Sequence, residues 1–143
     1  MDKRTLQHLR TRAQEEADAQ GRQWAAMQAH LHEAQRRLHE LGAYEQASYA
    51  QPLLAEHARQ LEERSLFLSK LREAWAQQRQ QCEFYAARLQ EQRLRWQAAQ
   101  VRAQSLDLLA ARQDDELQRL ERRREQAELD EFAQRRRGDV GMN

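Results

Sequence analysis

Residues 61–120, written in groups of seven, read LEERSLF LSKLREA WAQQRQQ CEFYAAR LQEQRLR WQAAQVR AQSLDLL AARQDDE LQRL. The first residue of every group is apolar: Leu61, Leu68, Trp75, Cys82, Leu89, Trp96, Ala103, Ala110 and Leu117. Three residues after each of these nine, five of the nine positions are also apolar. A seven-residue apolar repeat lies along one face of an α-helix, as in a left-handed coiled coil. The stretch therefore predicts a long helix whose apolar seam packs on another helix.

A shorter seam precedes this one. Its positions alternate in steps of three and four: Trp24, Met27, Leu31, Ala34, Leu38 and Leu41. Upstream, Leu6, Leu9, Ala13 and Ala17 continue it through two steps of four, which mark a stutter. Pro52 suits the first turn of a helix, and Gly138 after three arginines suits a helix end. We expect one coiled-coil domain over 1–137, with a helix over about 2–49, a turn near 50–55, a second helix over about 52–137 and a flexible tail over 138–143.

Composition points to the same fold class. Ala, Gln, Arg, Leu and Glu supply 102 of the 143 residues, and there is no Ile. Strands favour β-branched and aromatic side chains, so a sheet protein is nearly excluded. The predicted fold is all-α: a long antiparallel two-helix coiled-coil hairpin. Because the second helix is much longer than the first, its C-terminal part should form an overhang without a partner, although apolar residues continue along it.

Several kinds of site are disfavoured by the residues present. No apolar run reaches the ~20 residues of a membrane span, and no signal peptide is visible at the start. His32 and His39 lie seven apart, too far along a helix to share one metal ion. Cys82 falls in the seam, where a small buried hydrophobe is the simpler interpretation. No glycine-rich phosphate loop and no pocket for paired carboxylates is evident. We predict no enzyme activity, no cofactor and no metal.

Charge gives little direction to partners. The formal net charge is +1, so there is no general attraction to nucleic acid or anionic lipid. Residues 79–112 carry six Arg against three acidic residues, which could follow a phosphate backbone or an acidic protein groove. Mixed charge on a helix is more often a solvated face. Aromatic residues beside the seam, Tyr44 and Phe67, suggest instead a docking patch near the turn, or an apolar end to the hairpin.

Residues 124–135, REQAELDEFAQR, resemble the C-terminal signature of FliJ, the flagellar export protein family. The order of other features is similar over essentially the whole chain. A Leu-rich first helix ends in Leu41 and Tyr44, a short turn separates the helices, and then come Phe67, Leu71, Ala74 and Trp96.

This resemblance implies a cytoplasmic component of the flagellar type III export apparatus, peripheral at the inner face of the cytoplasmic membrane. It implies a central stalk in the ring of the hexameric export ATPase, contact with the cytoplasmic part of the export gate, and handling of export chaperones. The family's gate-binding positions correspond to Leu41, Tyr44, Phe67, Leu71, Ala74 and Gln78. Its ATPase-facing end corresponds to Arg119, Arg123, Glu128 and Asp130.

The sequence leaves three other functions open. The chain could be the equivalent stalk of a virulence secretion system. It could be a homo-oligomeric structural coiled coil without an ATPase partner. It could also be a nucleic-acid accessory protein, which would bind with a steep dependence on salt.

Overall fold

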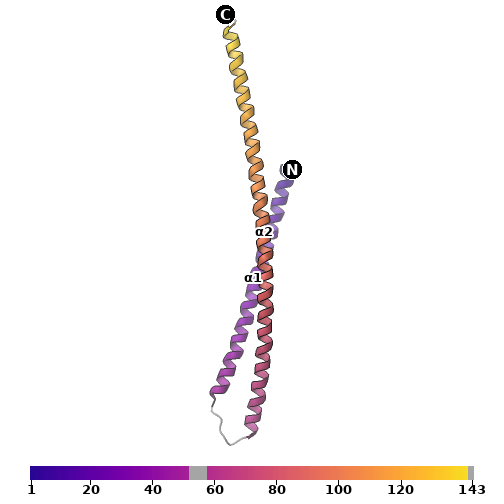
Figure 1. Ribbon diagram of the computed structural model, residues 1–143, viewed down its shortest axis with the longest axis vertical. Coiled ribbons are helices and arrows are strands. Elements are labelled where there is room, and N and C mark those ends of the chain that lie inside the picture. The colour runs from indigo at the N-terminus through magenta and orange to yellow at the C-terminus, as the bar shows by residue number, and fades with distance from the viewer. Residues whose placement is uncertain (52–57, 142–143) are drawn as a thin grey trace. The chain divides into compact units, whose positions relative to one another are not determined.

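The computed structural model describes residues 1–51 and 58–141. Over these residues the chain forms two helices and no strand: α1 (Lys3–Ala50) and α2 (Ala58–Gly141) (Figure 1). The predicted all-α class is confirmed, with two long helices that pack against each other. Pro52 and most of the expected turn lie outside the described residues.

The end of α2 differs from the prediction. The helix continues through Gly138 to Gly141 instead of ending after Arg137. A glycine ends a helix when it adopts a left-handed conformation, and among the described residues no glycine has a positive φ. Gly138 therefore serves as an ordinary helical residue, and the expected tail is helical at least as far as Gly141.

The chain divides into two compact units, Met1–Glu15 with Gln100–Asn143, and Glu16–Ala99. In each unit a segment of α1 packs against a segment of α2. A pair of helices with one seam between them has no deep core, and no large side chain among the described residues is completely buried. The packing must therefore be understood from the seam residues.

In the unit Glu16–Ala99, α2 is shielded where the heptads predict. The residues at both seam positions are partly or fully covered from Arg64 to Ala99. Their partners on α1 include the predicted positions from Trp24 to Leu41, all of which are likewise shielded. Leu61 is the exception: although the repeat begins with it, its side chain is 45 % exposed. The seam therefore begins at Arg64.

Two tryptophans and a glycine pack tightly together in this unit. The rings of Trp24 and Trp96 stack with centroids 5.0 Å apart and an interplanar angle of 8°. A Cβ atom on Gly21 would lie 3.0 Å from Nε1 of Trp96, which is closer than such contacts normally come. The Trp96 ring thus lies directly against the α1 backbone. Glycine suits this position because a side chain would press on that ring.

Polar residues occupy four second-seam positions of α2, and each of them donates hydrogen bonds to α1. Gln78 bonds the carbonyl of Ala34 at 3.0 Å, and the buried Gln92 bonds the carbonyl of Gln20 at 3.4 Å. The other two are Arg64, which bonds the carbonyls of Ser48 and Gln51, and Gln113, which bonds the carbonyl of Met1. Buried donors need acceptors, so a shifted register would leave these groups unpaired. These side chains therefore help to fix the register of the pair.

In the unit formed by Met1–Glu15 and Gln100–Asn143, three of the four buried seam residues are alanines. Leu6 and Ala13 of α1 are buried, as are Ala103 and Ala110 of α2. The Arg10–Asp107 ion pair at 2.9 Å flanks this seam. Exposed ion pairs of this kind contribute about 0–1 kcal/mol, so the apolar contacts contribute more.

The covered part of the seam on α2 ends before the heptad pattern does. Gln113 is the last partly covered residue of α2, and every residue from 114 to 140 is exposed. Leu117 and Leu120 keep the heptad spacing and are 43 % and 53 % exposed, as expected for apolar positions of α2 that no residue of α1 covers. Gln113, which bonds the carbonyl of Met1, is the last point of α2 at which the structure shows a hydrogen bond to the N-terminal part of the chain.

Candidate functional sites

The first candidate surface is the turn-side patch, by which we mean Leu41, Tyr44, Phe67, Leu71, Ala74 and Gln78. Tyr44 and Phe67 are 63 % and 52 % exposed. They lie at a similar level of the helix pair, because the contact of Gln78 with Ala34 and that of Arg64 with Ser48 enclose Tyr44 on α1 and Phe67 on α2. Two large apolar side chains at a similar level form a surface that a partner protein can cover.

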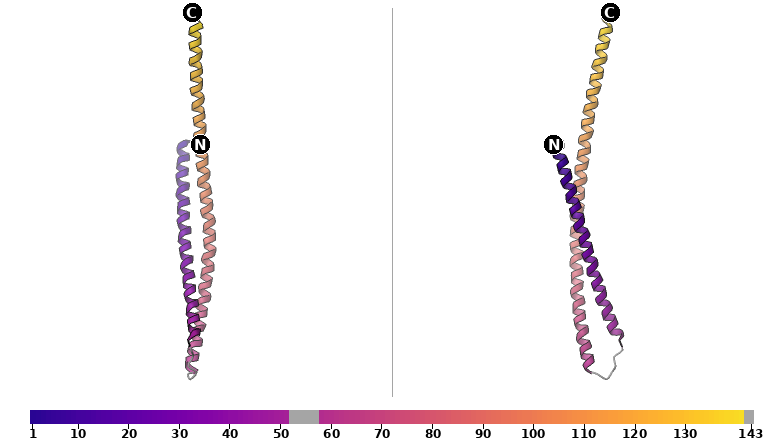
Figure 2. Two further views of the ribbon diagram at one scale, coloured as in Figure 1. Left: turned by 90° about the vertical axis from the view of Figure 1, so that its left-hand side faces the viewer. Right: turned by 180° about the vertical axis from the view of Figure 1, so that it is seen from behind.

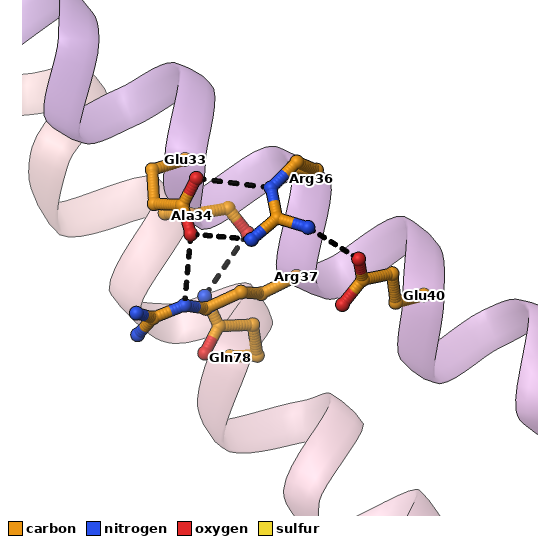
Figure 3. Close-up of polar contacts among 6 residues, drawn as sticks. All are labelled: Glu33, Ala34, Arg36, Arg37, Glu40 and Gln78. Carbon is orange, nitrogen blue, oxygen red and sulfur yellow. Dashed lines mark hydrogen bonds and ion pairs between the residues drawn. The ribbon is translucent and has the colours of Figure 1, made fainter.

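The other members of the turn-side patch serve the helix pair. Leu71 is only 9 % exposed, and Leu41 and Ala74 are half-buried. The half-buried Gln78 gives its amide to the Ala34 carbonyl, as Figure 3 shows. The structure therefore leaves Tyr44 and Phe67 as the accessible part of the patch, and the remaining residues support them from the seam.

A network of exposed charges lies on α1 beside Gln78 (Figure 3). Arg36 donates to both carboxylate oxygens of Glu33, at 3.0 and 2.7 Å, and also bonds Glu40. Arg37 approaches Glu33 at 3.3 Å. The hydrogen bond from Arg36, together with the charges of the two arginines, lowers the pKa of Glu33 to about 2. The hydrogen bond with Glu33 also raises the pKa of Arg36.

The sequence did not reveal a groove in the Glu16–Ala99 unit. It has a volume of about 580 Å³ and is lined by Tyr49, Leu61, Arg64, Ser65, Leu68, Ser69 and Arg72. Arg72 bonds the hydroxyl of Tyr49 and pairs with Glu45 at 3.3 Å, and both contacts raise the pKa of Arg72. Both arginines that line the groove already donate hydrogen bonds, Arg64 to main-chain carbonyls and Arg72 to Tyr49 and Glu45.

The second candidate surface is the C-terminal segment, residues 114–141. The four predicted ATPase-binding residues, Arg119, Arg123, Glu128 and Asp130, are all exposed there. Asp130 accepts a hydrogen bond from Gln126 at 3.1 Å. Large apolar side chains accompany these charges: Leu117, Leu120, Leu129 and Phe132 are 43–63 % exposed. A helix that carries such side chains in water presents binding surface rather than core.

No helix within residues 1–51 and 58–141 is long and apolar enough to cross a bilayer. Within the same residues no three His, Cys, Asp or Glu side chains come together as metal ligands.

The model of the family described as flagellar FliJ protein matches residues 2–139, nearly the whole chain. The chain belongs to the FliJ family. No curated protein and no solved structure matches it. FliJ-family membership makes the chain a component of the flagellar export apparatus, and the family is not a known family of enzymes.

Proposed function

We propose that α1 and α2 form an antiparallel hairpin and that residues 114–141 are its overhang. Contacts in both units support this. Gln92 bonds Gln20, and Gln78 bonds Ala34, so later residues of α1 meet earlier residues of α2. In the other unit, Gln113 bonds Met1, and Arg10 pairs with Asp107. Both views of Figure 2 draw the yellow end of α2 continuing beyond the N-terminus.

The chain acts, on this proposal, as the central stalk of the export ATPase ring. The observation that carries the proposal is the exposed C-terminal segment with its apolar residues beyond Gln113. Intrachain packing leaves these residues in water, where they gain nothing for folding. A single helix is also narrow, about 10–12 Å across with its side chains, so it can enter a ring. The candidate contacts are Arg119, Arg123, Glu128 and Asp130.

The turn-side patch is proposed to bind the cytoplasmic part of the export gate, with Tyr44 and Phe67 as the main contacts. Both side chains are exposed, and the seam residue Leu71 beside them is buried, which supports this proposal. Handling of export chaperones belongs to the same proposal. A peripheral position at the cytoplasmic face of the membrane would then result from these partners.

A pulldown with the cognate export ATPase and the cytoplasmic gate fragment tests both surfaces at once. A chain ending at residue 115 should lose ATPase binding and retain gate binding. The double variant Tyr44→Ala with Phe67→Ala should show the reverse, with helicity nearly unchanged. Full ATPase stimulation by the truncated chain would refute the stalk assignment. Normal swimming of cells carrying the double variant would show that Tyr44 and Phe67 merely close the end of the hairpin.

A further inference from the structure

The C-terminal segment contains an internal repeat of 12 residues. Residues 116–124 read ELQRLERRR, and residues 128–136 read ELDEFAQRR. We call these the first and second copies. Each begins with Glu-Leu, has Leu or Phe three residues after that Leu, and ends in Arg-Arg. The copies differ at the four remaining positions.

The shared positions lie on one face of the helix. An α-helix turns by about 100° per residue, so the five shared positions of each copy fall within an arc of about 120°. The four differing positions fall outside that arc. All residues of both copies are exposed, so this division does not come from packing within the chain. A face that repeats while the opposite side varies is expected of a surface that binds a partner.

The same helical geometry fixes how the two faces are related. Twelve residues advance the helix by about 18 Å and turn it by about 120° beyond whole turns. Leu120 and Phe132 therefore point in directions about 120° apart, as do Leu117 and Leu129. One straight groove or one neighbouring helix cannot cover both faces. A partner that meets both must surround the helix.

We propose that the two copies are interchangeable docking elements for one kind of site on the subunits of the surrounding ring, which lets α2 be held at two depths about 18 Å apart. This inference rests on the proposed stalk function. Subunits of a closed ring present their sites at one height, so one copy is engaged at a time. A rotation of 120° superimposes a six-membered ring on itself. After an axial shift of about 18 Å without rotation, the second copy therefore faces an identical site.

Binding measurements on full-length variants test whether the copies are alternatives. Leu117→Ala with Leu120→Ala removes the first copy, and Leu129→Ala with Phe132→Ala removes the second. If each copy alone can dock, either double variant should bind the assembled ATPase ring about twofold more weakly, because half of the binding modes is lost. The quadruple variant should lose at least about tenfold. Val140→Ala, an exposed apolar change outside both copies, is the matched control and should bind normally.

If both copies bound the ring at the same time, removing either copy alone would weaken binding about tenfold or more. That result would overturn the inference, and so would normal binding of the quadruple variant. If the unsubstituted chain fails to bind the ring at all, the proposed stalk function fails instead.

Photo-crosslinking identifies the part of the ATPase that each copy contacts. With p-benzoylphenylalanine in place of Leu120 or of Phe132, both chains should attach to the same peptide of the ATPase. The same crosslinker in place of Glu125, between the copies, should attach to a different peptide. Attachment of positions 120 and 132 to different ATPase peptides would contradict the two-depth arrangement. Attachment to a second copy of this chain would identify a different partner and also overturn it.

Discussion

Gly21 offers a sharp test of how the two helices meet. Replacing glycine by alanine inside a helix normally stabilises it by about 1 kcal/mol, because alanine has the higher helix propensity. At Gly21 the added Cβ would lie 3.0 Å from Nε1 and 3.4 Å from Cδ1 of Trp96. The ring cannot simply retreat, since it stacks on Trp24. Overpacking a well-filled site costs about 1–3 kcal/mol, so Gly21→Ala should change stability by between about zero and 2 kcal/mol in the unfavourable direction.

Gly42 provides the matched control on the same helix. A Cβ there would lie 3.9 Å from Nε1 of Trp75, an ordinary contact. Gly42→Ala should therefore gain the full helix-propensity term of about 1 kcal/mol. Urea unfolding monitored by circular dichroism gives both free energies of unfolding. We expect Gly42→Ala to be more stable than Gly21→Ala by about 1–3 kcal/mol. Equal stabilisation by the two substitutions would show that Trp96 does not lie against the α1 backbone.

Three further variants probe polar contacts. Arg64→Ala should lower the unfolding free energy by about 1–2 kcal/mol, measured by urea unfolding, because it removes the donor to the last α1 carbonyls; an unchanged value would deny Arg64 this capping role. Gln92→Glu puts a carboxylate beside the Gln20 carbonyl and should cost about 1–3 kcal/mol at pH 7. Its stability should recover in acid, and equal loss at pH 4 would point to a steric cause. The pKa of Glu33 is lowered to about 2 by the Arg36 hydrogen bond, so its contribution is present above its ordinary pKa of 4.5 and is lost as pH falls from 4.5 towards 2. Thermal melts should show a smaller acid loss for Glu33→Gln; an equal loss would mean that the network contributes nothing.

The helical fold could be predicted from the sequence because it depends on spacing alone. The heptads placed seam residues such as Leu71 and Trp75 correctly, since apolar side chains at these intervals must share one face. The ends of the seam could not be predicted in the same way. The unequal helix lengths already indicated that apolar residues such as Leu117 would be left uncovered, but the residue at which the seam ends depends on the register of the two helices.

The partners of the polar and glycine residues could not be predicted from spacing either. Gln78 and Gln92 look like interruptions of the apolar pattern, yet each meets an α1 carbonyl. The close approach of Gly21 to Trp96 also depends on which residues lie opposite each other. The candidate site was predictable in part: Tyr44 and Phe67, expected beside the seam, are exposed, whereas Leu71, which the resemblance also counts among the gate-binding positions, is buried in the seam. The roles of these residues and of the predicted ATPase contacts stay predictions.

Hydrogen exchange of the full chain, free and bound to the assembled export ATPase, tests the central claim most directly. In the free chain, amides of residues 114–141 should exchange fastest within α2, because no α1 residue packs on them. ATPase binding should slow exchange in this segment and leave residues 64–99 unchanged. Slower exchange only in residues 41–78, or no change in the C-terminal segment, would contradict the account.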